Sequence, residues 1–250
     1  EVVTTIQRVI IEVDEARVIR LQLPADQHRS TLCDDLQCRG NEWADVEWNA
    51  DASQLAFVST SRDHKRAQLR IADTNTGAIH DVLEEKAATQ FEPGWGRVNW
   101  HYLPASNEVI WFSERENWGH LYLYDAGSGK LKNQITTGEW TVTGLLRVDE
   151  KNRLLYFLGM GREHGRNPYF AHLYRVGFDG KNLTLLTPED GNHEISLSPS
   201  GSFFVDNYSK PDVPGTGVLR DAAGKLLARL EQADITRLVA EHRAARPGAM

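Results

Sequence analysis

Cysteine is scarce in this chain, with Cys33 and Cys38 the two cysteines among 250 residues. Their C-x4-C spacing suits a small hairpin disulfide in an oxidising compartment, and two free thiols in a reducing one fit equally well. No second Cys/His pair at zinc-binding spacing accompanies them. We therefore expect no metal site and no cofactor, and the state of the two thiols stays open.

Positive charge and long apolar runs are also lacking. The chain has 28 Lys and Arg residues against 35 Asp and Glu, a net charge of −7, which argues against nucleic acid as a partner because its binding depends on cationic contacts to phosphates. No apolar run approaches the roughly 18–20 residues that span a bilayer, so we expect no membrane segment. The start, EVVTTIQRVI, lacks the basic and apolar blocks of a signal peptide and resembles strand sequence from within a domain, which predicts a partial chain. The compartment is left open, with a periplasmic or secreted location slightly favoured.

The chain contains no G-x-S-x-G pentapeptide, the turn that presents the nucleophilic serine in α/β-hydrolases. The nearest matches, DAGSGK and SPSGSF, fall where hairpin turns are expected. A glycine-rich stretch at 159–167 lies between two expected strands instead of opening a helix, so we interpret it as a loop and not a phosphate site. We assign no catalytic residue in this chain.

The chain does contain an internal repeat. Residues 44–79 match residues 96–131 almost without gaps, and residues 142–183 and 193–228 follow the same pattern. The period is about fifty residues, as the equivalent turn aspartates indicate: Asp73, Asp125, Asp179 and Asp221.

Each repeat contains four expected strands. The second strands (LAFVS, VIWFS, LLYFL, FFVDN) are dense in aromatic and β-branched residues, and the third strands alternate with a period of two. Asp-x-x-x-Gly or Asp-Gly then predicts a hairpin turn into the fourth strand. Four antiparallel strands repeated every forty to fifty residues are typical of β-propeller blades. We predict an all-β propeller of about four blades plus a partial one.

The repeat also predicts where the blades begin and end. We expect a partial blade at 1–26, a loop at 27–43, blades at 44–95, 96–138, 139–191 and 192–231, and a helical exit at 232–250.

Trp95 and Arg97 are the candidate binding residues. They lie in FEPGWGRVNW, on the expected connection between two blades, where loops reach one mouth of the ring. An aromatic ring beside a guanidinium there would suit the rim of a substrate chamber. A tryptophan packed between blades explains the pattern equally well.

Other polar residues favour structural roles. His120 and His172 occupy the same place in two repeats, just before the third strand, which indicates a structural or rim role. Glu114 and Glu116 flank Arg115, and LEE at 83–85 ends a blade; we interpret these acidic pairs as chance features of exposed loops.

Several longer phrases resemble the propeller domain of dipeptidyl peptidase IV-like serine peptidases in the prolyl oligopeptidase family, and most closely its bacterial branch. The likeness is collinear over roughly residues 40–240. The phrases that carry it are WFSERENWGHLYLYD (111–125), GEWTVTGLL (138–146), LLYFLGMGRE (154–163), HLYRV (172–176) and LSPSGSFFVDNYSKPDVPGTGVLRD (197–221).

The resemblance implies an eight-bladed propeller that caps an α/β-hydrolase domain. In this family a Ser-Asp-His triad in the hydrolase domain releases N-terminal dipeptides after Pro or Ala. A glutamate pair in the propeller binds the free α-amino group of the peptide substrate. The chain would then be the C-terminal half of the propeller, a non-catalytic wall that gates access to the chamber.

The chain departs from the family pattern in what is absent. The hydrolase domain, which would follow residue 240, is missing, and the glutamate pair belongs to an earlier blade, so we do not assign it to 83–85 or 114–116. An alternative is a stand-alone propeller that binds peptides or proteins without catalysis. Another is a related hydrolase with an acylaminoacyl or oligopeptidase preference. A homodimer is also left open.

Overall fold

The computed structural model describes residues 5–25, 45–91, 99–237 and 240–241. In this part of the chain the regular structure is almost entirely β-strand, with helical backbone at 236–237 and 240–241. The strands form one two-stranded sheet and four four-stranded antiparallel sheets, each made from consecutive strands. The predicted all-β class with four-stranded blades is confirmed. The predicted loop at 27–43, with Cys33 and Cys38, lies outside the described residues.

The strands follow one another in simple up-and-down order. The N-terminal hairpin contains β1 (Val9–Glu12) and β2 (Arg17–Arg20). The first sheet contains β3 (Val46–Trp48), β4 (Gln54–Thr60), β5 (Arg66–Asp73) and β6 (Ile79–Lys86). The second contains β7 (His101–Leu103), β8 (Glu108–Ser113), β9 (His120–Asp125) and β10 (Leu131–Gln134). The third contains β11 (Thr141–Asp149), β12 (Leu154–Met160), β13 (Ala171–Gly177) and β14 (Thr184–Leu185). The fourth contains β15 (Asn192–Leu197), β16 (Phe203–Lys210), β17 (Val213–Asp221) and β18 (Leu226–Gln232).

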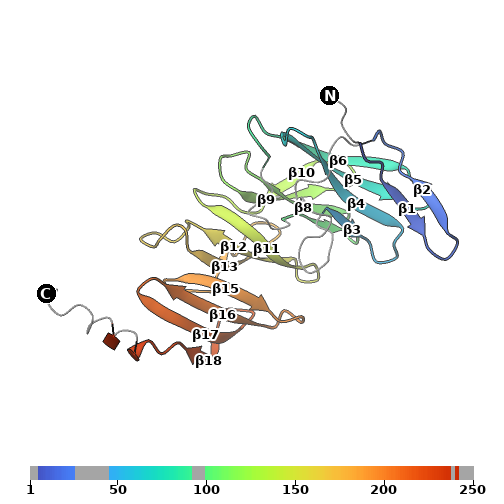
Figure 1. The fold of residues 1–250 in the computed structure, drawn as a ribbon. Coiled ribbons are helices and arrows are strands. Elements are labelled where there is room, and N and C mark those ends of the chain that lie inside the picture. Colours follow the sequence, from blue (N-terminus) through green and yellow to red (C-terminus); the bar gives the residue numbers. More distant parts are fainter. Residues whose placement is uncertain (1–4, 26–44, 92–98, 238–239, 242–250) are drawn as a thin grey trace.

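The sheets stand side by side in chain order, with the N-terminal hairpin and the fourth sheet at opposite ends of the row (Figure 1). Each sheet uses both faces, because side chains alternate along a strand. On β4, Phe57 packs toward the N-terminal hairpin, while Ala56 and Val58 pack toward the second sheet. The apolar core is therefore a series of layers between neighbouring sheets, and the repeat in the sequence is the repeat of these layers.

The predicted Asp-to-Gly hairpin turns are present, and they pack against the preceding sheet. Asp125 Oδ1 accepts a 2.7 Å hydrogen bond from the Ser128 N–H, and Gly129 follows with a φ of 67°. A Cβ atom on Gly129 would lie 2.1 Å from the carbonyl oxygen of Val82 in the first sheet. Glycine is needed here both for its backbone dihedral and for this close approach.

The two ends of the row leave apolar side chains exposed. Val13 of the N-terminal hairpin is 85% exposed and Ile11 is 59% exposed. On the fourth sheet, Leu230 is 54% exposed. β18 continues through Gln232, so the strand extends one residue into the segment predicted as a helical exit.

Candidate functional site

The predicted rim residues Trp95 and Arg97 lie outside the described residues, in the connection from β6 to β7. The residues that flank this segment are buried. Phe91 stacks on Trp111 of the second sheet, with ring centroids 6.0 Å apart. Asn99 accepts a 2.7 Å hydrogen bond from a backbone N–H of β11 in the third sheet. Both sides of the connection are thus anchored in interfaces between sheets.

A cavity of about 500 Å³ opens beside Phe91. One wall is the segment that follows β6, and the other is the loop between β8 and β9. We call this cavity the Arg115 cleft; its lining is Glu85, Lys86, Ala87, Ala88, Thr89, Gln90, Phe91, Glu114, Arg115 and Asn117.

Glu85, on β6, forms the floor of the Arg115 cleft and is only 9% exposed. Its carboxylate accepts a short hydrogen bond from the Ser113 hydroxyl, a 2.7 Å bond from Arg115 Nη2 and a 3.3 Å bond from Trp111 Nε1. A buried carboxylate is tolerated only when such partners replace its water. The cleft therefore has a charged floor that is fixed by both sheets.

The guanidinium of Arg115 contacts two tyrosine rings in addition to its bond to Glu85. It lies 4.4 Å from the centroid of the Tyr122 ring and 5.8 Å from that of Tyr124. Burial, with a smaller contribution from nearby Glu116, raises the pKa of Tyr122 to about 12, so the phenol stays neutral. Arg115 keeps a third of its side chain exposed to the cleft.

This arrangement can bind but is not built for nucleophilic catalysis. The Ser113 hydroxyl donates to Glu85 and accepts from Arg115 Nε at 2.8 Å, and Glu85 is itself paired with Arg115, so the hydroxyl is a structural member of this buried network. The rim offers charged and amide groups, such as Lys86 and Gln90, beside exposed backbone. Such a lining suits the polar main chain of a peptide.

Elsewhere, His193 and Asp206 form a buried pair with 2.7 Å between Nδ1 and Oδ1. The other ring nitrogen, Nε2, lies 3.0 Å from the carbonyl oxygen of Glu189 and not near a serine, so this pair is not part of a triad. Among the described residues, no group of three or more His, Cys, Asp or Glu side chains could hold a metal ion. Within the same residues, no helix has the length and apolar character to cross a membrane.

The two repeat-related histidines are structural, as predicted. His120 Nε2 donates to the carbonyl of Gly138 at 2.9 Å, and Nδ1 lies 3.1 Å from the Thr136 hydroxyl. His172 Nδ1 donates to the carbonyl of Thr187 at 3.1 Å. Both rings tie the start of a third strand to the segment after the fourth.

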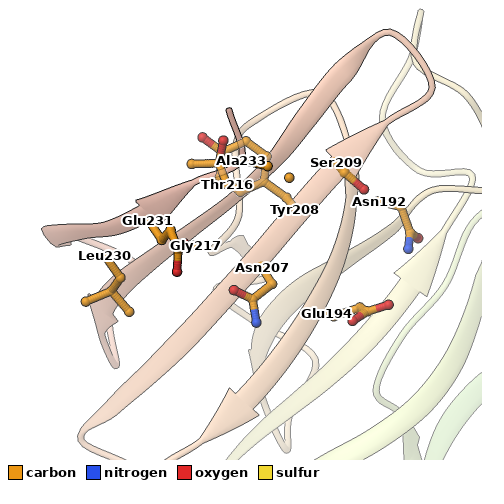
Figure 2. Close-up of a pocket in the computed structure, with 11 residues that line it drawn as sticks. Asn192, Glu194, Asn207, Tyr208, Ser209, Thr216, Gly217, Leu230, Glu231 and Ala233 are labelled. Carbon is orange, nitrogen blue, oxygen red and sulfur yellow. The ribbon is translucent and has the colours of Figure 1, made fainter. Parts of the chain in front are cut away.

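A second hollow lies on the outer face of the fourth sheet, with a volume of about 440 Å³ (Figure 2). One cross-strand row passes through it, in which Glu194 pairs with Asn207, Asn207 with Gly217, and Gly217 with Glu231. No described residue gives either glutamate a hydrogen bond or an ion pair. The hollow is open, and both charged side chains in its lining, Glu194 and Glu231, are exposed, so the Arg115 cleft is the stronger candidate.

One sequence interpretation is wrong. The acidic pairs at 83–85 and 114–116 were expected to be chance features of exposed loops, but Glu85 is buried and bonded to Arg115. Glu116 does lie at the surface, where it accepts a 3.1 Å bond from Gln134. The alternation along β6 could have marked Glu85 as an inward-facing residue, because Leu83 also packs toward the second sheet.

Comparison with known proteins gives one consistent result. The family model described as the "Dipeptidyl peptidase IV (DPP IV) N-terminal region" matches residues 2–215. "Dipeptidyl peptidase 4" of the fungus Arthroderma otae is 36% identical over 177 residues, which are 64% of this chain and 22% of that protein. "Dipeptidyl peptidase 4" of Trichophyton rubrum is 35% identical over 140 residues, 53% of this chain and 17% of that protein.

The crystal structure of Porphyromonas gingivalis dipeptidyl peptidase 4 has the same fold over 95% of this chain, with a TM-score of 0.74 at 19% identity. The match covers 31% of that chain. This chain thus spans about a fifth to a third of the proteins it resembles. These curated relatives are fungal and the solved structure is bacterial, so the bacterial branch stays a prediction.

Proposed function

The chain belongs to the family of the dipeptidyl peptidase IV N-terminal region, and we propose that it is a non-catalytic part of the propeller of a serine-type dipeptidyl peptidase. The whole protein would release N-terminal dipeptides of the Xaa-Pro or Xaa-Ala type. The match to this one region, which covers the first three four-stranded sheets and the start of the fourth, carries the proposal. A separate α/β-hydrolase domain would supply the triad, and a peptide with a free N-terminus would be the substrate.

The role of these sheets is to wall and gate the chamber. In an up-and-down sheet the connections after the second and fourth strands lie at the same end. The β6–β7 connection, the β8–β9 loop and the exit after β18 therefore share one mouth of the ring. A hydrolase domain that continues from this exit would face the Arg115 cleft. Trp95 and Arg97 lie on the same connection as the cleft wall, which supports them as rim residues.

The catalytic part of the proposal is tested with a chromogenic Gly-Pro substrate. We expect the longer protein that contains this chain to release the chromophore, and the isolated 250-residue chain to release none. Turnover by the isolated chain would overturn the assignment. A reading frame that ends at residue 250 would favour the alternative, a stand-alone module that binds peptides.

The gating part is tested in the longer protein with Trp95→Ala and Arg97→Ala. Each variant should raise KM for peptides of about ten residues several-fold and leave kcat for the small chromogenic substrate within about twofold, because that substrate does not reach the rim. Lys151→Ala, on the turn at the opposite end of the third sheet, is the matched control. Equal KM values for long peptides in all four proteins would remove Trp95 and Arg97 from the site.

A further inference from the structure

The interface between the third and fourth sheets is built around buried charge. Three turn aspartates share one register: each pairs with the first residue of the second strand of its sheet. The pairs are Asp73 with Gln54, Asp125 with Glu108, and Asp221 with Phe203. Counted from these turns, the position filled by Phe57 in the first sheet and by Trp111 in the second is filled by Asp206 in the fourth. The four equivalent residues are all buried: Phe57 (0% exposed), Trp111 (1%), Phe157 (0%) and Asp206 (0%).

Each carboxylate oxygen of Asp206 has a side-chain partner. Its Oδ2 accepts a 3.1 Å bond from Arg220 Nε, and its Oδ1 lies 2.7 Å from His193 Nδ1. Arg220 also donates to Glu189 at 2.6 Å and to the carbonyl of Gly224 at 3.0 Å. The network links β15, β16 and β17 to the segment that follows β14.

Both ring nitrogens of His193 have a partner. Nδ1 lies 2.7 Å from the carboxylate of Asp206, and Nε2 lies 3.0 Å from the carbonyl oxygen of Glu189. The Tyr208 ring, 5.3 Å away, covers one side of the imidazole.

His172 packs against this ring from the third sheet and must stay neutral. The centroids of His172 and His193 are 4.8 Å apart. His172 is 2% exposed, its Nδ1 donates to Thr187, and its Nε2 is buried without a hydrogen-bond partner among the described residues. Protonation would add an N–H donor without a partner and a positive charge beside the His193 ring.

The nearby carboxylates of the described residues, Glu163, Asp190 and Glu189, already have cationic partners, and Glu189 is paired with Arg220 at 2.6 Å. Glu163 is engaged by Arg162 at 3.0 Å and by the Tyr174 hydroxyl at 3.0 Å. Asp190 is paired with Lys210 at 3.0 Å. Arg166 adds a further positive charge, held by backbone carbonyls. Burial first, and then the charge of His193, lower the pKa of His172.

We propose that the packed His172–His193 pair makes the interface between the third and fourth sheets open on acidification. At neutral pH His172 is uncharged and the interface is closed. Because the neutral form is favoured in the closed state, its contribution is present above the ordinary pKa of histidine and is lost as the pH falls below it. This response belongs to the isolated chain, so it does not depend on the proposed peptidase function.

The test is amide hydrogen exchange at pH 7.5 and pH 5.5. In each sample the mean exchange rate of the β16 and β17 amides is divided by the mean exchange rate of the β8 and β9 amides, which gives an exchange ratio for the fourth sheet. This ratio cancels the intrinsic pH dependence of exchange. The second pH lies one pH unit below the ordinary histidine pKa of 6.5, so an interface that closes only around the neutral ring should open up to about tenfold more often there. We therefore expect the ratio to rise several-fold, with about tenfold as its limit, in the wild-type chain.

His172→Asn keeps a donor near the Nδ1 position and cannot be protonated, so its ratio should stay within about twofold. His101→Gln is the matched control: His101 lies 3.1 Å from Glu47 and 3.7 Å from Glu150, two carboxylates that favour its charged form, so it should respond as the wild type does. A flat ratio in the wild-type chain overturns the proposal even if the asparagine variant is unfolded. A full rise in His172→Asn overturns it as well.

Discussion

The interface between the second and third sheets is packed with aromatic rings, whereas the interface between the third and fourth combines an apolar cluster around Phe204 with a buried charge network. In the first, Trp140 packs on Phe157 and Tyr174 with ring centroids 6.0 and 5.8 Å apart. In the second, Asp206 and Arg220 occupy inward positions. The sheets have the same strand order and the same turns. The comparison teaches that a repeat can preserve its geometry while the forces between its copies change.

The difference has a physical consequence. Burial of aromatic surface stabilises by about 25 cal/mol per Å² and does not depend on pH. A buried ion pair often adds no more stability than apolar groups of the same size, but loss of one partner is costly. The aromatic interface should therefore resist a change of conditions, and the charged one should respond to it.

The largest effect is expected in the aromatic interface. Phe157→Ala removes a fully buried ring and leaves a cavity, so the free energy of unfolding should fall by about 3–5 kcal/mol. Urea unfolding followed by tryptophan fluorescence measures it. Phe203→Ala is the control, because Phe203 lies on the outer face of the fourth sheet and is 46% exposed. A similar loss in both variants would mean that this aromatic layer does not carry the stability.

A slightly smaller effect is expected in the charged interface. Asp206→Ala leaves His193 and Arg220 facing each other without their shared carboxylate, and should cost about 3 kcal/mol at pH 7. Asp179→Ala, at an exposed turn, is the control and should cost less than about 1 kcal/mol. If Asp206→Ala unfolds at the same urea concentration as the wild type, the network does not hold the fourth sheet in place.

The fold could be predicted from the sequence because each blade contains its own evidence. Alternation within a strand and a turn glycine after each aspartate are local patterns, and they recur four times. The central residues of β4, β8 and β12 are apolar and buried on both faces, as expected for strands that pack between two neighbouring sheets.

The polar sites could not be predicted in the same way, because their partners come from other repeats. Glu85 is buried by Trp111 and Ser113, more than twenty residues further along the chain. The FFVDN strand was grouped with three apolar strands, and nothing local distinguishes a buried aspartate from an exposed one. The repeat register places Asp206 at the position of Phe57 and Trp111, but its partners His193 and Arg220 become evident only in the structure.

Both interfaces contain the same kind of contact, in which a turn glycine approaches a carbonyl oxygen of the preceding sheet. Substitution of this glycine should lower the free energy of unfolding by the same amount in both interfaces. A Cβ atom on Gly180 would lie 3.0 Å from the carbonyl oxygen of Ile135, and one on Gly224 would lie 2.8 Å from that of Leu186. Both glycines have positive φ, so Gly180→Ala and Gly224→Ala should each cost about 2 kcal/mol. Gly165→Ala is the control, since its φ is 78° but nothing lies within 4 Å, and it should cost about 1 kcal/mol.

Chemical denaturation of the three glycine variants separates the cost of the backbone dihedral from that of the contact. If the free energy of unfolding falls in only one of Gly180→Ala and Gly224→Ala, the turn packs closely against the preceding sheet in only that interface. The contrast between aromatic and charged layers would then extend to the turns.

The smallest effect concerns an ion cluster at the edge of the aromatic interface. Glu108 on β8 is buried and accepts hydrogen bonds from Lys132 and, at 2.7 Å, from Arg153 of the third sheet. Burial alone would raise its pKa, but these bonds outweigh it and lower the pKa of Glu108 to about 2. The carboxylate therefore stabilises the fold above the unfolded value of 4.5, and this contribution is lost as the pH falls from 4.5 toward 2.

Because Lys132 and Arg153 are nearly half exposed, solvent screens the cluster, and we expect a loss of about 1–2 kcal/mol across this window. Urea midpoints at pH 6, 4 and 3 measure it, and Glu108→Gln should flatten this part of the profile. This window lies below the ordinary histidine pKa of 6.5, under which the interface between the third and fourth sheets begins to open, so the aromatic interface should still be intact at that point. An identical fall in the wild type and in Glu108→Gln would place the acid sensitivity of this interface in other carboxylates.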